Sequence, residues 1–529
     1  MDRRRALTLM TSALAVTAVP VRASDLVSAF VQSLAQAVAD DAVLATFYRD
    51  RGYATLWTGL QDADRRLAVL NAFDTASAHG LPTGRYDAEA LRGQFAEVET
   101  EADVGRLEVA VSRAYLAFVR DLSSGALEPS RVDAGIKREI VRPDPALVLA
   151  RALADDFAGY LANLPPPAPQ YARLMAEKFA LEAMVAAGGY GAQIGAEALG
   201  PGDSGAAVVQ LRDRLTVLGY LSGSSAGAYD PDIQLAVQRY QLDNGLDPSG
   251  NAGAATIAAL NTEAGERLKS VVVAMERLRW MGTTPWGARH IWVNQPDFTA
   301  QVVDEGRVTF QTRVVIGKVG VDTESPEFSD EMEFMVVNPT WSVPRSITVK
   351  EYLPMLQRNG NAQGQLQVID RAGRVVPRSA INFAAYTPGN FPYALRQPPS
   401  DGNALGKVKF MFPNPYNIYL HDTPSKSLFD KDVRAFSHGC IRVGSPFDLA
   451  YVLLAPQSDD PKGLFKSYLA GGREAVLNFD TAIPVHLVYF TAWPNPQGMI
   501  SYRRDIYGRD AALFAALTEA GVVLQGVQS

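Results

Sequence analysis

The spacing of apolar residues divides the chain into helical and β-rich stretches. Over residues 24–198, apolar side chains recur every three or four positions, as in residues 41–48 and 106–122, and this predicts a mainly helical domain. The same spacing predicts a long amphipathic helix over 262–287. Between residues 288 and 495, alternating or continuous runs of β-branched and aromatic residues predict a β-rich domain.

Breaks in this pattern define further units. Residues 199–261 have their own helical repeat of apolar residues, separated by loops rich in glycine and serine, and favour a small helical bundle. Glycine, asparagine and proline interrupt the strands at about 349–405, a stretch too long to be a plain loop in a compact domain. Residues 496–529 form a C-terminal extension. The predicted fold class is multi-domain α+β.

Length and composition limit the class of protein. At 529 residues the chain is too long for one hydrophobic core, and its 47% apolar and 20% charged residues are those of a globular protein. Arginines at positions 3–5, an apolar run at 6–19 and Ala23 are typical of a secretory signal over residues 1–23. An uncleaved anchor is the alternative, and the arginines also permit twin-arginine export. Cleavage of this segment would remove four of the 50 basic and one of the 57 acidic residues and leave a mature chain with a net charge of −10. A chain this acidic is not expected to bind nucleic acid or anionic lipid through its overall charge.

The chain contains a single cysteine, Cys440, which cannot close an intramolecular disulfide. It follows His438 by two residues and His421 by nineteen. A cysteine and a histidine are the minimum for a thiolate nucleophile with a general base, and spacing alone leaves open which histidine is the base. The alternative is a buried cysteine that acts as a small apolar residue. Its neighbours are glycine, histidine, serine and arginine, and this favours a catalytic cysteine over a buried apolar one.

The residues around this cysteine resemble a known family. His421, a fifteen-residue gap and then Ser437-His438-Gly439-Cys440-Ile441-Arg442 are similar to the signature of the L,D-transpeptidases. Segments 336–347, 411–424 and 505–509 resemble the large, multi-domain branch of that family. The resemblance implies a helical scaffold domain over 24–198, continued by 262–287, and a three-helix peptidoglycan-binding module inserted at 199–261. It also implies an L,D-transpeptidase catalytic domain over 288–495 with a lid subdomain at about 349–405.

Within the module, Ile233 stands where this kind of module usually has threonine, so its fold is better supported than its affinity for carbohydrate.

The resemblance assigns roles to individual residues. Cys440 is expected to be the nucleophile, His421 the general base and the backbone carbonyl of Asp422 the group that orients the histidine. Backbone N–H groups of Gly439 and Cys440 are expected to be free to hold an oxyanion, since glycine allows close approach of the backbone. A shared proton would make Cys440 and His421 an ion pair. The residues expected to contact substrate are Arg442, His438 and Ser437, with a structural salt bridge as the alternative for Arg442. Trp341 and Tyr419 are aromatic candidates for the substrate channel, and as aromatics in β-rich segments either could equally belong to the core. No cofactor is implied, and one cysteine with two histidines lacks the ligand number of a zinc site.

The function implied by the resemblance is cross-linking of peptidoglycan in the periplasm, in association with the cell wall. The thiolate would attack a donor tetrapeptide after diaminopimelate, and an acceptor diaminopimelate amine would resolve the thioester. Carbapenem-type β-lactams would acylate the same cysteine. The alternatives are the same acyl-enzyme with water as acceptor (carboxypeptidase or endopeptidase), anchoring of a protein amine, and a non-catalytic scaffold that binds the cell wall.

Overall fold

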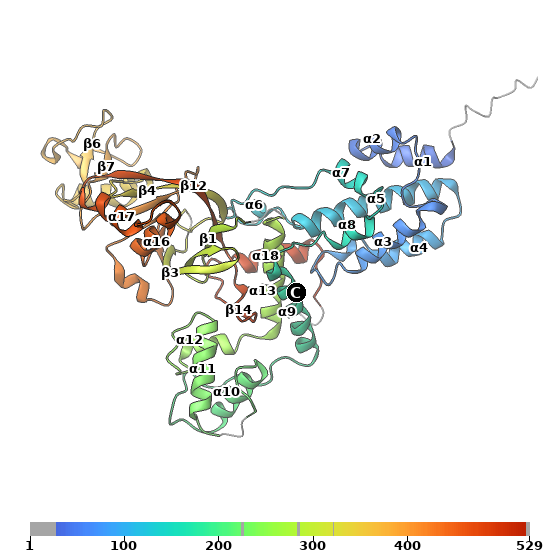
Figure 1. Ribbon diagram of the computed structural model, residues 1–529, viewed down its shortest axis with the longest axis horizontal. Helices are drawn as coiled ribbons and strands as arrows, with labels where there is room; N and C mark the ends of the chain where they lie inside the picture. The colour runs from blue at the N-terminus through green and yellow to red at the C-terminus, as the bar shows by residue number, and fades with distance from the viewer. Residues whose placement is uncertain (1–27, 224–226, 283–285, 321, 525–529) are drawn as a thin grey trace, which may run out of the picture.

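The computed structural model describes residues 28–223, 227–282, 286–320 and 322–524. The predicted signal at 1–23 lies outside the described residues. In Figure 1 the N-terminal helices and the β-rich domain lie at opposite ends of the long axis, with α9, α13 and α18 between them. The predicted multi-domain α+β fold class is confirmed.

The N-terminal region is built around the long helix α5. Asp41 caps α2, and Thr100 forms a capping box with Asp103 at the start of α5, so side chains satisfy the free N–H groups of both helices. Buried Trp57 packs edge-on against Tyr115 of α5, in a core shared by most of these helices. The helices are α1 (Ala29–Ala37), α2 (Ala42–Asp50), α3 (Ala63–Asp74), α4 (Ala88–Ala96), α5 (Glu101–Ser124), α6 (Pro129–Val132), α7 (Pro145–Arg151), α8 (Phe157–Ala162) and α9 (Pro169–Ala186).

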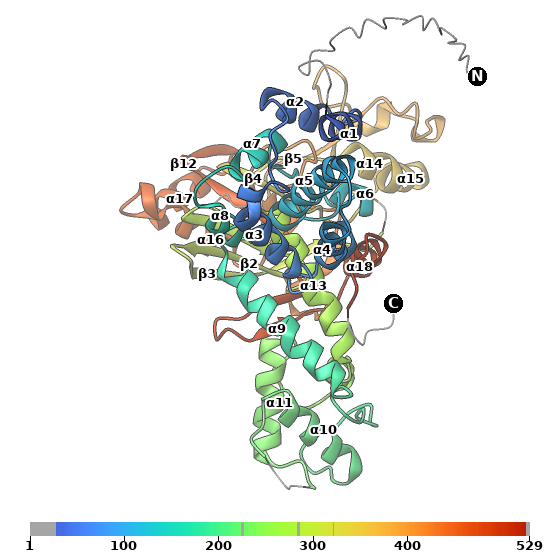
Figure 2. The same cartoon turned by 90° about the vertical axis from the view of Figure 1, so that its right-hand side faces the viewer.

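A small helical bundle is inserted between α9 and α13. Its helices are α10 (Ala206–Val217), α11 (Pro231–Asp243) and α12 (Ala254–Leu260), and α13 (Ala264–Trp280) follows directly. Buried apolar residues of all three form a core of their own, and α13 returns to pack on α9. Figure 2 shows the bundle projecting beyond the α9–α13 pair.

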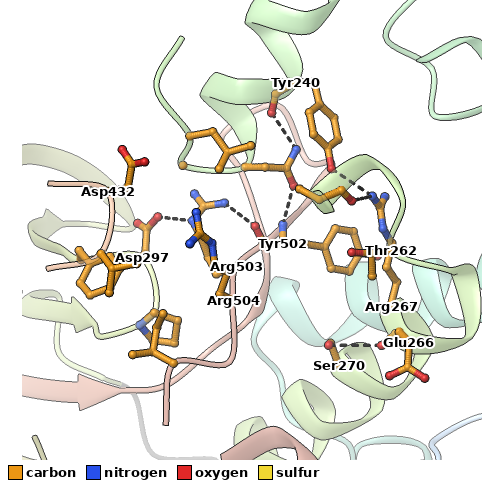
Figure 3. A pocket seen from close by; sticks show the side chains of 18 residues that line it. Tyr240, Thr262, Glu266, Arg267, Ser270, Asp297, Asp432, Tyr502, Arg503 and Arg504 are labelled. Atoms are coloured by element: carbon orange, nitrogen blue, oxygen red, sulfur yellow. Dashed lines mark hydrogen bonds and ion pairs between the residues drawn. The ribbon is translucent and has the colours of Figure 1, made fainter. Parts of the chain in front are cut away.

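The bundle contacts the rest of the molecule along a polar seam (Figure 3). Asn244 accepts a hydrogen bond from the Tyr502 N–H at 3.0 Å, and Arg503 donates to the Asp243 carbonyl at 2.8 Å. Arg267 of α13 donates to the Tyr240 hydroxyl at 3.2 Å. A cavity of about 210 Å³ lies within this seam.

The β-rich half contains one large sheet. Its strands pair in the order β10-β3-β11-β9-β8-β4-β12-β1-β2, and β2 also pairs with β3, so the sheet closes on itself. Helices α16 (Pro446–Leu454) and α17 (Pro461–Ala470) contribute to its core. The strands are β1 (Arg289–Asn294), β2 (Thr299–Asp304), β3 (Arg307–Gly317), β4 (Phe328–Val337), β8 (Val408–Met411), β9 (Leu420–His421), β10 (Ala435–Ser437), β11 (Ile441–Val443) and β12 (Ala475–Val488).

A small subdomain lies between β4 and β8 in the sequence. Strands β5 (Trp341–Ser342), β7 (Ala394–Gln397) and β6 (Gln367–Ile369) pair in that order, accompanied by α14 (Arg345–Ile347), a π-helical turn (Thr348–Tyr352) and α15 (Leu353–Arg358). These elements enclose a separate apolar core.

The C-terminal segment crosses the middle of the molecule. Strands β13 (Ala492–Pro494) and β14 (Ile500–Tyr502) form a hairpin, and α18 (Arg509–Glu519) packs against α13 and α6. Among the described residues, no helix is long and apolar enough to cross a membrane.

Candidate active site

Cys440 lies in the short turn that joins β10 to β11. The preceding residue, Gly439, has φ +109°, a left-handed conformation that favours glycine. A Cβ at this position would also come within 3.2 Å of the Ile418 side chain. Both constraints explain why glycine precedes the cysteine.

Serine hydroxyls hold this turn. Ser437 accepts the Gly439 N–H at 3.2 Å and donates to the Cys440 carbonyl at 2.5 Å. Ser325, which precedes β4, donates to the Gly439 carbonyl at 2.7 Å and accepts the Gly317 N–H at 2.9 Å. The backbone N–H groups of Gly439 and Cys440 were both expected to be free, but the Gly439 N–H donates to the Ser437 hydroxyl. The Cys440 N–H has no hydrogen-bond partner among the described residues.

The register of three neighbouring strands brings the candidate residues together. His421 of β9 pairs with Lys409 of β8 on one side and with Arg442 of β11 on the other. Paired residues project to the same face of a sheet, and so do residues two apart along a strand. Tyr419 and Cys440 therefore share the face of His421, one step along the strands. Cys440, just before β11, thus lies diagonal to His421 of the adjacent strand β9.

The imidazole of His421 has a defined orientation. Its Nδ1 lies 2.5 Å from the Asp422 carbonyl oxygen, which can only accept a hydrogen bond, so Nδ1 carries the proton and Nε2 is free to accept one. The Asp422 carboxylate is engaged elsewhere, by the Lys407 N–H at 2.9 Å and by Lys426 Nζ at 2.6 Å. The imidazole is thus oriented by the Asp422 carbonyl and not by the Asp422 carboxylate.

Burial keeps both groups neutral in the free site. Burial raises the pKa of Cys440 to about 11, although hydrogen bonds from Tyr419 and the Arg442 charge oppose the shift. Burial, together with Arg442, lowers the pKa of His421 to about 4. Both shifts favour the neutral thiol and the neutral imidazole over the ion pair expected from the sequence.

The remaining predicted residues lie in different surroundings. The His438 Nε2 is 2.6 Å from Glu351 of the π-helical turn and 3.4 Å from Lys318 Nζ, so this histidine joins the small subdomain to the turn. Trp341 is buried in the core of the small subdomain, edge-on to Tyr352 at 6.3 Å between ring centroids. Arg442 and Tyr419 lie beside Cys440, whereas Ser437 is buried within the turn.

The sequence did not point to several residues that lie in or around the site. Lys409 was not considered, although a lysine within the apolar strand 408–411 was a usable signal. Segment 505–509 was noted as a motif only. The Tyr507 hydroxyl donates to the Gly317 carbonyl at 2.6 Å and accepts the Ser325 N–H at 3.3 Å, and Arg509 donates to the Ser325 carbonyl at 3.0 Å. This segment therefore supports the serine that holds Gly439.

Within the described ranges, no group of three or more histidine, cysteine or carboxylate side chains could hold a metal ion.

Comparison with known families agrees with this architecture. A model of the scaffold domain matches residues 42–177, one described as "Putative peptidoglycan binding domain" matches 204–260, and the L,D-transpeptidase catalytic domain matches 288–465. A curated "Putative L,D-transpeptidase" from Haemophilus influenzae is 34% identical over 224 residues, which are 42% of this chain and 44% of that protein. The match thus spans less than half the length of that curated relative.

Two solved structures of L,D-transpeptidases were also found. Those from Xylanimonas cellulosilytica and Stackebrandtia nassauensis are 16% and 13% identical, and each match covers 55% of this chain and 98% and 94% of theirs. Their TM-scores, 0.17 and 0.22, are too low to bear on the fold. The family models together show that the chain joins a scaffold domain and a peptidoglycan-binding domain to an L,D-transpeptidase catalytic domain, the domain that contains Cys440 and His421.

Proposed function

We propose that the chain is a cysteine acyltransferase that joins two peptidoglycan stem peptides. The proposal is carried by the strand register, which sets Cys440 diagonal to His421, a histidine whose Nδ1 is occupied by the Asp422 carbonyl and whose Nε2 is free. This arrangement provides a nucleophile and an oriented base on one face of the sheet.

The first half-reaction forms a thioester. Cys440 Sγ attacks the carbonyl that links diaminopimelate to the terminal D-alanine of a donor tetrapeptide, while His421 Nε2 takes the thiol proton. Because both groups are neutral beforehand, proton transfer accompanies the attack. The Cys440 N–H stabilises the oxyanion, with Gly439 setting its direction. The C–N bond then breaks, and the D-alanine amine leaves with the proton from His421.

The second half-reaction releases the acyl group. The amine of an acceptor diaminopimelate attacks the thioester, His421 takes a proton from that amine, and the proton returns to the departing thiolate. The product is a direct diaminopimelate–diaminopimelate cross-link. Water or a protein amine in the acceptor position would give the hydrolase or anchoring reaction instead.

The other parts have supporting roles. Tyr419 and Arg442 lie where the donor stem would reach Cys440, and Ser437 and His438 position the turn and the small subdomain, which acts as a lid over it. The module at 199–261 holds the enzyme on peptidoglycan, in the periplasm.

The test is incubation of the purified chain with a tetrapeptide muropeptide, followed by mass spectrometry of the protein and products. Wild type should give an acyl-enzyme and cross-linked dimer, Cys440→Ala neither, and His421→Ala a rate lower by several powers of ten. His438→Ala should keep most of the activity. If His421→Ala were fully active and His438→Ala inactive, His438 would be the general base instead of His421. A folded wild-type protein that forms no acyl-enzyme would favour the non-catalytic scaffold.

A second prediction is that carbapenems acylate Cys440, because a thiol placed to attack an amide also opens a strained cyclic amide. Intact mass should increase by one drug molecule, located by digestion to the Cys440 peptide. The adduct should be absent in Cys440→Ala and slower to form in His421→Ala. A wild-type protein with a reduced thiol and no adduct would contradict a working acylation site.

A further inference from the structure

Two cations flank His421 on the active-site face. The register sets Lys409, His421 and Arg442 in one row across three strands, and Cys440, just before β11, precedes Arg442 of this row by two residues. That step along a strand is about 6.8 Å. Lys409 also lies over the Tyr419 ring, with Nζ 5.8 Å from its centroid.

Neither cation is neutralised by the protein. Lys409 and Arg442 are both half-buried, and among the described residues neither makes an ion pair or a side-chain hydrogen bond. The Nε of Arg442 is buried without a partner. Glu474 acts on Lys409 from a distance, but its carboxylate accepts the Thr340 N–H.

Removing a cation from water without a counter-charge is unfavourable, so partly buried cations normally pair. Two neighbouring cations that do not pair within the protein, Lys409 and Arg442, can therefore bind an anionic group of a ligand. Because the row lies beside the nucleophile, the anion belongs to a molecule held at Cys440.

We propose that Lys409 and Arg442 form a subsite for the terminal carboxylate of the donor stem. This subsite rests on the proposed function, and it names the side chains that would recognise the donor stem peptide. In a donor ending in D-alanine, the carboxylate is separated from the attacked carbonyl only by one nitrogen and one carbon. A further residue would displace it by about 3.5 Å, beyond the row. Lys409 is therefore a specificity-determining residue for stems that end one residue after the attacked carbonyl.

Occupation of this subsite also affects the base. Arg442 and Lys409 both contribute to the low pKa of His421, against the opposing charge of Asp422. A carboxylate bound between the cations offsets them and raises that pKa, so His421 becomes a better proton acceptor when a donor is present.

The experiment compares two donors, a tetrapeptide with a free terminal carboxylate and the same peptide as its terminal amide. Acylation kcat/KM is measured for the full-length chain by mass spectrometry. Wild type should favour the acid by about tenfold or more, as expected for a charge-assisted contact. Lys409→Met should lose about tenfold more on the acid than on the amide, and Lys409→Arg should restore most of the preference.

The matched control is Lys466→Met, an exposed lysine on α17. Equal rates for both donors in wild type, or an equal loss on both in Lys409→Met, would overturn the subsite, because a merely structural lysine does not distinguish acid from amide.

A binding measurement separates this proposal from the chemistry. In Cys440→Ala, calorimetry should show tighter binding of the acid than of the amide, and the difference should disappear when Lys409→Met is added. If wild type forms no acyl-enzyme, the proposed function fails while this comparison still decides the subsite. Equal binding of the two peptides would reject the subsite regardless of turnover.

Discussion

At the scale of single residues, the reactivity of Cys440 depends on a balance between burial and charge. Burial alone would leave the thiol inert, because the thiolate loses its hydration. Tyr419, Arg442 and Lys409 each act in the opposite direction, yet the pKa remains raised, to about 11. In the proposed mechanism, the thiol is therefore protected at rest and needs His421 at the moment of attack.

This balance predicts the pH dependence of alkylation in the free enzyme. The rate with iodoacetamide should continue to rise up to about pH 11, because the thiolate is the reacting form. Arg442→Gln removes a charge that lowers the pKa, so its profile should move to higher pH and its rate at pH 9 should fall severalfold. Arg473→Gln, an exposed arginine, should follow wild type. A wild-type profile that levels off near pH 7 would indicate a preformed ion pair instead.

At the scale of elements, the turn between β10 and β11 is held from outside its own hairpin. Ser325 holds the Gly439 carbonyl, and Tyr507 in turn holds the backbone of Gly317 and Ser325. The direction of the Cys440 N–H therefore depends on segments more than sixty residues away on either side.

Tyr507→Phe tests this support. Loss of the hydroxyl should lower the rate of acylation about tenfold, because a small displacement of the oxyanion donor is costly. Alkylation of Cys440, which needs no oxyanion donor, should stay within about twofold of wild type. Tyr451→Phe is the control, since that hydroxyl has no hydrogen bond among the described residues. An equal loss in both reactions would mean that Tyr507 affects the thiol and not the donor geometry.

Sequence patterns predicted the kind of elements better than their pairing. Periodicity distinguished the helical from the β-rich part, and the neighbours of Cys440 singled it out as a candidate nucleophile. The pairing of Lys409 with His421 was not predictable, because strand register follows from long-range packing. For the same reason Trp341, an aromatic residue of a β-rich segment, gave no sign that it belongs to a separate core. The capture of the Gly439 N–H by Ser437 depends on a turn geometry that residue types do not specify.

At the scale of the whole molecule, the bundle of α10–α12 is attached through the two ends of its insertion and through the polar seam. The Ile194 N–H donates to Asn261 at 2.8 Å, so the two ends of the insertion lie close together. Its seam with β14 does not include Cys440 or His421.

Replacing residues 199–261 with a short Gly/Ser linker should therefore preserve the catalytic half. Binding to intact sacculi should fall by about tenfold or more, since one of two attachment points is lost. Acylation by a soluble muropeptide should stay within about twofold. The intact chain with Cys440→Ala is the control for binding without turnover. Loss of acylation in a folded deletion variant would show that the seam helps to build the site.

Four histidines are buried with lowered pKa values, and the three with the largest shifts should make the stability of the whole chain depend on pH. Burial lowers the pKa of His79, His421 and His486 to about 4, against about 6.5 in an unfolded chain. Below pH 6.5 the unfolded state binds more protons, so stability is complete above that pH and is lost as the pH falls toward 4. Each histidine contributes about 3 kcal/mol to this loss.

The unfolding temperature should accordingly decrease from pH 7 to pH 4.5. In His79→Gln it should start lower but decrease less, since one of the titrating groups is gone. A variant with the same decrease as wild type would show that His79 does not take part.

The support of the catalytic turn by Tyr507 and Arg509 also has a consequence for synthesis. All nine strands of the large sheet, together with Cys440 and His421, precede these two residues in the sequence. The hydrogen bonds that Tyr507 and Arg509 make to Gly317 and Ser325 therefore form only when the C-terminal segment packs across the sheet domain. The final geometry of the turn before Cys440 thus depends on the last part of the chain to be added.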